Sequence, residues 1–328
     1  MLKAFRGFLF ASSVGLLVLT STFFVSISPA AEYPTKTIQI INPFPAGAST
    51  DILARILTDK LSALLGQPVV VINKTGGGGA IGIKAVKDAP ADGHTIMVAP
   101  PPLVLIPIAR KGIGFSLNDF AAISLAGSSG YAMVVKKEAR WQTLEEVVKD
   151  AKKNPGKLIW AIPLTGSAGH FTYELFKMAT GTDITNVPMG GETPVATAIL
   201  GSHADMSFLS LGTSNSHLQA GTMRALAVTH PKRLKELPEI PTTAEAGYPK
   251  VNTIPWFLFA VHAKTPRAII NRLDQVFKEA LRDKEIIVKI EKAGMIVENI
   301  GAEDADKFLA EEHKKWSEVA RVANITAQ

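Results

Sequence analysis

Short β-rich runs alternate along the chain with segments whose apolar residues recur at helical spacing. Residues 37–42 predict a strand, and the apolar stripe within residues 49–65 predicts a helix. The same plan then repeats, with a strand predicted over residues 69–73 and a helix over residues 80–88. Strands that alternate with helices in this way indicate an α/β fold, with parallel strands joined by crossover helices.

The alternation restarts in the middle of the chain and gives way to a mostly helical last third, from about Pro266. Further strands are predicted at 94–98, 121–125, 131–136, 158–162 and 224–229, and further helices at 143–153, from near His170, and at 268–281, 284–293 and 302–322. The simplest arrangement begins one lobe, inserts a second and returns to the first with a helical tail. We therefore expect lobe 1 to comprise residues 32–126 and 229–328, and lobe 2 to comprise residues 127–228. Strand-end loops of both lobes would face a shared ligand cleft.

Three loops share one design, in which small residues after a strand are followed at once by a helix. They span residues 45–51, 75–79 and 165–170. Backbone N–H groups at the positive end of a helix bind anions without help from Arg or Lys. The first loop could also be an ordinary tight turn in which Ser49 or Thr50 caps the helix. Pairing of such loops across two lobes favours the ligand-binding interpretation.

The N-terminal segment has the composition of a secretory signal peptide. Lys3 and Arg6 precede a largely apolar run over residues 8–25, and residues 28–30 offer a small-x-small cleavage site. We expect residues 1–31 to be removed and the mature protein to work in the periplasm. A membrane anchor is the alternative, which the serines, threonines and glycine within the run weaken.

Composition narrows the function classes further. The chain has 328 residues, more than one hydrophobic core usually serves, which favours two lobes. It has no cysteine, which excludes disulfides, thiolate metal sites and a thiol nucleophile. The net charge of +6 is spread along the chain without a basic stripe interleaved with aromatics, so we expect no nucleic-acid binding. The seven histidines are scattered, and we expect no metal site.

Two chemical motifs are matched only in part. Residues 77–82 fit the dinucleotide fingerprint G-x-G-x-x-G, but no strand-ending acid follows about 20 residues later, so we expect no cofactor. Residues 165–169 miss the G-x-S-x-G nucleophile elbow, because Thr165 stands where the first glycine is needed. Ser167 and His170 are neighbours on one loop, which is not a catalytic geometry by itself. We expect no catalytic residues, and a periplasmic hydrolase or isomerase using Ser167 and His170 is the alternative.

Asp51 and Arg55 stand at the i, i+4 spacing of an ordinary helix ion pair, which we expect to occupy Arg55.

Residues 43–55 resemble the P-F-x-x-G-G-x-x-D-x-x-A-R segment of the Bug receptors, the substrate-binding subunits of tripartite tricarboxylate transporters. Further matches follow in family order, and the likeness covers nearly all of the chain after residue 31. They are Asn73 with 76–79 and Gly82, 91–93, 165–174, Val187 and Pro188 with Gly190 and Gly191, Gly201 with Asp205 and Met206, Gly221 with 224–228, and 237–242 with 245–247.

The resemblance implies a type II periplasmic-binding-protein fold, in which two α/β lobes close on the ligand by a hinge. It also implies a non-enzymatic, monomeric solute receptor that binds a small carboxylate, such as a di- or tricarboxylate or an aromatic acid. The receptor would deliver that ligand to integral-membrane transporter subunits. A subunit that senses a ligand for a histidine kinase is a further alternative.

Carried over by position, the resemblance also implies a set of ligand-binding residues. They are Phe44, Ala46, Gly47, Ala48, Ser49 and Asp51 in the first loop, Thr165, Gly166, Ser167, Ala168 and His170 in the second, and Gly190. Backbone amides and small hydroxyls near Gly47, Ser49, Gly166 and Ser167 are then expected to hold the carboxylate, with few or no Lys or Arg side chains. Ala46 and Ala48 depart from residues that are often Pro and Gly in the family. Met189 stands where Tyr or Phe followed by Lys is common.

Overall fold

The elements predicted for the first third of the chain all form, and they build one half of a mixed sheet. The computed structural model describes residues 33–235 and 237–325, so the predicted signal peptide, residues 1–31, lies outside the described part. The strand β1 pairs in parallel with both β2 and β3, and helices follow β1 and β2. These elements are β1 (Ile38–Asn42), α1 (Ser49–Leu65), β2 (Val69–Asn73), α2 (Ala80–Lys87) and β3 (Thr95–Ala99). Parallel strands linked by helices confirm the α/β class.

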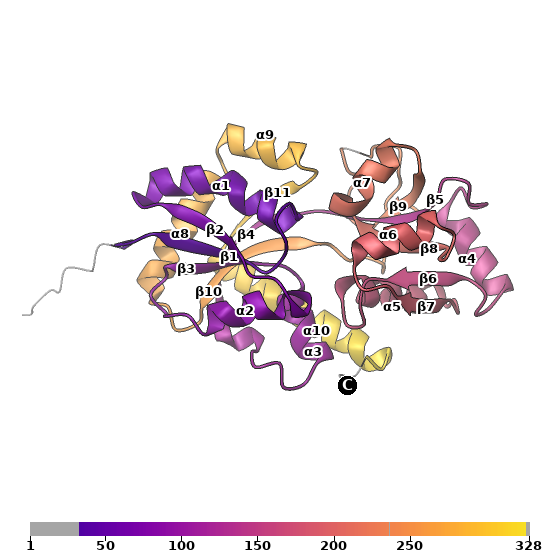
Figure 1. The fold of residues 1–328 in the computed structure, drawn as a ribbon, viewed down its shortest axis with the longest axis horizontal. Coiled ribbons are helices and arrows are strands. Elements are labelled where there is room, and N and C mark those ends of the chain that lie inside the picture. Colours follow the sequence, from indigo (N-terminus) through magenta and orange to yellow (C-terminus); the bar gives the residue numbers. More distant parts are fainter. Residues whose placement is uncertain (1–32, 236, 326–328) are drawn as a thin grey trace, which may run out of the picture. The chain divides into compact units, whose positions relative to one another are not determined.

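Antiparallel strands complete this sheet beside the parallel strands that the sequence pattern predicts. The strand order is β11-β4-β10-β3-β1-β2, and β10 pairs antiparallel with both β3 and β4 (Figure 1). The added strands are β4 (Phe120–Ser128), β10 (Trp256–His262) and β11 (Ile296–Gly301). β11 interrupts the last third, which the sequence pattern predicts as mostly helical, between α9 (Lys284–Lys292) and α10 (Ala302–Val322). α8 (Arg267–Ala280) packs near the same sheet.

A second sheet, in the order β7-β6-β8-β5-β9, is formed by the middle of the chain. β6 pairs in parallel with β7 and β8, whereas β5 pairs antiparallel with β8 and β9. Its core is built around Trp160, whose ring lies 5.0 to 5.5 Å from those of Phe176, Phe208 and Tyr173. The elements are β5 (Tyr131–Lys136), α4 (Leu144–Lys153), β6 (Ile159–Ile162), α5 (Ala168–Thr180), β7 (Thr185–Pro188), α6 (Glu192–Leu200), β8 (Met206–Ser210), α7 (Leu211–Gln219) and β9 (Met223–Val228).

The proline-rich stretch after β3 forms a helix, α3 (Pro102–Ala109), that the sequence pattern does not predict. Pro102 occupies the first turn, where its missing N–H costs nothing. Pro107 lies inside the helix, where it removes one hydrogen bond. Five of the eight residues are buried apolar side chains, which offsets that loss. Among the described residues, no helix has the length and apolar character needed to cross a membrane.

The chain passes from the first sheet to the second between β4 and β5, and returns between β9 and β10. The two connecting segments lie together, because the Ser129 N–H donates to the Pro255 carbonyl at 2.8 Å. Helices of the two sheets also touch, since the rings of Phe171 in α5 and Trp316 in α10 meet edge to face with centroids 5.6 Å apart. The lobe bounds given above stay a prediction.

Candidate ligand-binding site

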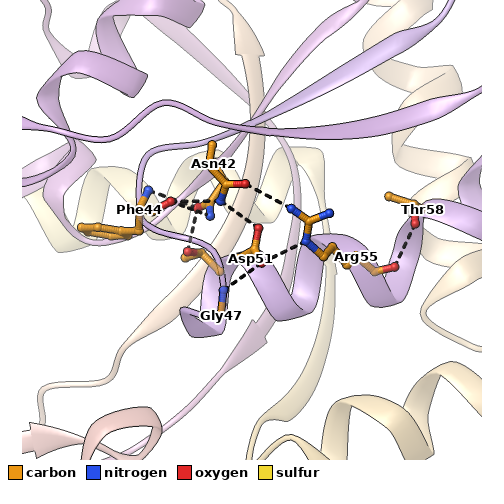
Figure 2. Close-up of polar contacts among 8 residues, drawn as sticks. Asn42, Phe44, Gly47, Asp51, Arg55 and Thr58 are labelled. Atoms are coloured by element: carbon orange, nitrogen blue, oxygen red, sulfur yellow. Dashed lines mark hydrogen bonds and ion pairs between the residues drawn. The ribbon is translucent and has the colours of Figure 1, made fainter.

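The loop after β1 is held by two asparagines at the ends of neighbouring strands. Asn42 and Asn73 are partners in the β1–β2 register, and each donates from its side-chain amide to the Phe44 carbonyl at 3.0 Å (Figure 2). Asn42 is fully buried and also accepts the Thr50 hydroxyl at 2.7 Å. The resemblance includes Asn73 only as a family match and leaves Asn42 out. The repeated Ile-Ile-Asn and Val-Ile-Asn endings of β1 and β2 are the sequence signal for this pair.

Asp51 is the buried centre of the same loop. Its carboxylate accepts the Gly47 N–H at 3.0 Å, the Asn73 side-chain amide at 2.8 Å and the Arg55 Nε at 2.9 Å (Figure 2). Burial opposes its ionisation, but the hydrogen bonds from Arg55, Gly47 and Asn73 outweigh that cost and lower the pKa of Asp51 to about 2. The expected Asp51–Arg55 ion pair is confirmed, and Arg55 bonds Asn73 as well, at 3.1 Å. Asp51 therefore fixes the shape of the loop through these hydrogen bonds.

The start of α1 has no side-chain cap, which corrects the expectation that Ser49 or Thr50 caps this helix. The residue at the cap position is Ala48, and the Thr50 hydroxyl bonds Asn42 instead. In the part of the chain that the structure describes, the N–H groups of Ser49 and Thr50 have no hydrogen-bond acceptor. Unpartnered N–H groups at a helix start, together with the positive end of the helix dipole, form a place for an anion.

The loop before α5 is closed by its own side chains. Ser167 caps α5 by accepting the His170 N–H at 3.3 Å, and its Oγ also accepts the Leu164 N–H at 3.3 Å. The buried ring of His170 turns back onto the loop, where its Nδ1 accepts the Gly166 N–H at 3.0 Å. Its Nε2 lies 3.7 Å from Glu174 Oε1. Within the described residues, the N–H groups of Ala168 and Gly169 remain without an acceptor.

Two amides of the expected donor set are occupied by side chains of their own loops, whereas Ser49, which belongs to the same set, keeps an unpartnered N–H group within the described residues. The Gly47 and Gly166 amides, which were expected to face the carboxylate, donate to Asp51 and His170. The donors without partners belong instead to the first residues of α1 and α5. Both glycines have positive φ angles, 82° and 76°, so each supplies the left-handed turn that lets a side chain four residues later accept its N–H.

The remaining expected residues surround the two helix starts. Phe44, Ala48 and Ala168 are half-buried, whereas Ala46, Thr165 and Gly190 are exposed. The Gly190 N–H donates to the Pro163 carbonyl at 2.9 Å, which joins the loop before α6 to the loop before α5.

The first loop also approaches the start of α7, and the second loop approaches the end of α3. A Cβ added at Gly212, in the first turn of α7, would stand 2.9 Å from the Ser49 Oγ. A Cβ added at Gly166 would stand 2.8 Å from the Cβ of Ala109, at the end of α3. The glycines thus permit close approach between residues of the two sheets. The spacing of Ser210 and Thr213 across the β8–α7 junction is the sequence signal for the start of α7.

The glycine-rich segment after β2 serves packing. Its first part is the short 3-10 helix η1 (Gly77–Gly79), in place of the loop predicted over 75–79. A Cβ at Gly82 would lie 2.7 Å from both the Lys74 carbonyl oxygen and the Pro43 Cα, so α2 sits directly against the loop after β1. Among the described residues, no three His, Asp or Glu side chains are grouped so that they could hold a metal ion.

Comparison with known proteins identifies the family. The family model described as the tripartite tricarboxylate transporter family receptor matches residues 53–325. Protein BugT of Bordetella pertussis, strain Tohama I, is 32% identical over 311 residues, which cover 94% of this chain and 95% of BugT.

Solved structures extend the comparison to the fold. The R. palustris protein Rpa4515, solved with adipate, is 30% identical with a TM-score of 0.81, over 90% of this chain and 100% of that one. The periplasmic binding protein BugD is 26% identical with a TM-score of 0.78, over 90% of this chain and 100% of that one. The chain therefore has the α/β fold of these periplasmic binding proteins and belongs to the tripartite tricarboxylate transporter receptor family.

Proposed function

We propose that this protein is a periplasmic solute receptor that binds a small carboxylate and delivers it to the membrane subunits of a tripartite tricarboxylate transporter. The observation that carries the proposal is the pair of helix starts, at α1 and α5, whose first N–H groups have no acceptor within the described part of the chain. A carboxylate offers two oxygens to such donors, and each hydrogen bond to a charged ligand contributes about 1.5 to 3 kcal/mol. The relative Rpa4515 was solved with adipate, which is a small carboxylate.

In this proposal the expected site residues divide into two roles. Ser49, Ala168 and Ser167 contact the carboxylate through backbone or hydroxyl donors. Asp51 and His170 hold the Gly47 and Gly166 amides and so fix the shape of the two loops. Phe44, Ala46, Ala48, Thr165 and Gly190 line the surroundings of the ligand.

The contacts of His170 argue against the alternative of an enzyme that uses Ser167 and His170. A general base must place a ring nitrogen within hydrogen-bond reach of the nucleophile. Here Nδ1 accepts the Gly166 N–H and Nε2 faces Glu174, while the Ser167 Oγ accepts the backbone N–H of His170. We therefore propose a receptor that returns its ligand unchanged. We also propose that residues 1–31 are a cleaved signal peptide and that the mature receptor, with the two lobes given above, acts as a monomer.

Binding without turnover is the direct test. Mass spectrometry of ligand that co-purifies with the native protein, followed by a thermal-shift screen of carboxylates, should give one bound carboxylate per chain that is recovered intact. A ligand at 100 times its dissociation constant should stabilise the protein by about 2.7 kcal/mol. Chemical conversion of a bound carboxylate would contradict the proposal, and so would a screen in which no carboxylate stabilises the protein.

Replacing Ser167 with Ala should weaken carboxylate binding by about 10- to 100-fold, the loss of one hydrogen bond to a charged group. The hydroxyl accepts two N–H groups, so its own proton is free to donate to the ligand. Because Ser167 also caps α5, the variant should lose about 1 kcal/mol of stability, which the sequence alone did not indicate. Calorimetry and urea unfolding measure the two effects.

Thr143→Ala is the matched control for Ser167→Ala. Thr143 caps α4 in the same way, by accepting the Glu146 N–H at 3.2 Å. This variant should lose similar stability and keep its affinity. Equal affinity in the parent and Ser167→Ala would remove Ser167 from the binding site.

A further inference from the structure

One carboxylate side chain is held at the point where the loops of the second sheet meet the first helix start. Glu192, in the first turn of α6, accepts the hydroxyls of Ser210 and Thr213 through the same oxygen, Oε2, the latter at 2.6 Å. In the part of the chain that the structure describes, its other oxygen, Oε1, accepts no hydrogen bond. A half-buried carboxylate is thus fixed with one oxygen free to accept a further donor.

The surroundings of Glu192 connect it to both proposed carboxylate-binding loops. On one side, the Gly190 N–H bonds the Pro163 carbonyl, which leads into the loop before α5. On the other side, Thr213 follows Gly212, whose Cβ position lies 2.9 Å from the Ser49 Oγ. Glu192 therefore lies close to the starts of α1 and α5, which are proposed to hold the ligand. It belongs to neither of these two helices.

A second polar group without a partner accompanies it. Tyr131 stands directly opposite Ser210 in the β5–β8 ladder, so the two side chains share one face of the sheet. Tyr131 is only 6% exposed, yet its hydroxyl has no hydrogen-bond partner among the residues that the structure describes. Burial, and then the negative charge of Glu192, raise the pKa of Tyr131 and keep this hydroxyl protonated. The free carboxylate oxygen and the free hydroxyl are both capable of binding a polar group of a ligand.

We propose that Glu192 determines the ligand class of this receptor: it selects carboxylates that carry a protonated amine at their far end and rejects those that carry a second carboxylate there. This inference rests on the proposed function, because it requires one ligand carboxylate at the helix starts. A fixed negative charge attracts an ammonium group and repels a carboxylate in a partly buried place, where charge interactions are stronger than in water. The second carboxylate of a dicarboxylate ligand would lie beside Glu192, which carries the same charge.

Three probes of equal length separate the charge effect from shape. 6-Aminohexanoate, hexanoate and adipate share a six-carbon chain with a carboxylate at one end. Their far ends carry an ammonium group, a methyl group and a second carboxylate, respectively. Calorimetry on the parent should show 6-aminohexanoate binding at least about tenfold more tightly than adipate, or about 1.4 kcal/mol. The corresponding four-carbon set, 4-aminobutanoate, butanoate and succinate, repeats the comparison at a second length.

Glu192→Gln should remove the preference. The amide oxygen of Gln still accepts the Ser210 and Thr213 hydroxyls, so the fold is kept while the charge is lost. Adipate should then bind at least about tenfold more tightly than it binds the parent, and 6-aminohexanoate correspondingly less tightly. Glu145→Gln, which removes a charge from the first turn of α4, is the control and should leave all affinities unchanged.

The outcomes separate the inference from the function on which it rests. If the parent binds carboxylates but Glu192→Gln leaves the ratio of 6-aminohexanoate to adipate affinity unchanged, the role of Glu192 is wrong and the receptor function stands. If the parent prefers adipate to 6-aminohexanoate, the inference is likewise overturned. If no probe or screened carboxylate binds the parent, the proposed function fails and the inference fails with it.

Discussion

Replacing Asp51 with Asn is expected to lower the free energy of unfolding by about 2 to 4 kcal/mol at pH 7. Carboxylate binding should also weaken, because the first loop loses the hydrogen bonds that fix its shape. Asp51 accepts three donors and is 4% exposed, so little water can replace those bonds. An Asn side chain offers one oxygen and one NH₂, and the latter would face an N–H or guanidinium donor. Urea unfolding measures the stability loss, and calorimetry measures the affinity.

The stability difference between the parent and Asp51→Asn should depend on pH in a defined direction. The pKa of Asp51 in the folded protein is about 2, below its ordinary value of 3.8. A depressed carboxyl pKa gives stability that is fully present above the ordinary value and is lost as the pH falls through the folded value. The difference should therefore be constant from about pH 7 down to pH 4 and shrink by about 2 kcal/mol as the pH approaches 2.

Asp59→Asn is the control for the acid series. Asp59 lies two turns further along α1, is exposed, and has no ion pair or hydrogen bond within the described residues. This variant should follow the parent at every pH. A stability difference for Asp51→Asn that stays the same from pH 7 to pH 2 would show that the carboxylate charge is not what holds the loop.

The candidate site could be located from the sequence because its determinants are local. A strand that ends in small residues and leads directly into a helix must present N–H groups at that junction. Residues 45–51 and 165–170 carry this pattern, and both junctions lie where it predicts. The Asp51–Arg55 pair follows from the i, i+4 spacing of any helix.

The direction of individual N–H groups could not be predicted, because it depends on side chains that fold back from the helix. The Gly47 and Gly166 amides meet Asp51 and His170 only because both glycines adopt left-handed backbone angles. Nothing in the residue types distinguishes such a turn from one whose amides face the ligand. Contacts between sheets, such as Gly212 with Ser49, depend on long-range packing and leave no local pattern.

The missed strands have a similar cause. β10 (Trp256–His262) is a central strand whose side chains are buried on both faces of the sheet, so it lacks the alternation of apolar and polar residues that marks a half-buried strand. β11 is a half-buried edge strand between two helices with strong helical periodicity, and the register of its pairing with β4 shifts between Val297 and Ile300. Periodicity alone therefore could not separate it from the helices that flank it.

Replacing Gly47 with Val is expected to reduce carboxylate affinity by at least about 100-fold. Gly47 has a φ of 82°, where a β-branched residue is strained by about 1 to 2 kcal/mol. The strain is relieved only if the loop rotates, and rotation takes the Gly47 N–H away from Asp51. The unpartnered N–H groups of Ser49 and Thr50 lie two and three residues later in the chain, so the rotation changes their direction as well. Two lost bonds to a charged ligand, at about 1.5 to 3 kcal/mol each, give the expected factor.

Gly66→Val separates the loss of affinity from the loss of stability. Gly66 ends the same helix with a φ of 69°, and a Cβ at Gly66, like one at Gly47, meets no atom within 4 Å. Both variants therefore carry the same kind of backbone strain and should lose similar stability in urea unfolding. Only the residue at position 47 adjoins the helix start that is proposed to hold the carboxylate. If calorimetry shows equal affinities for the two variants, the ligand does not bind at the start of α1, because strain at either end of that helix would then have the same consequence.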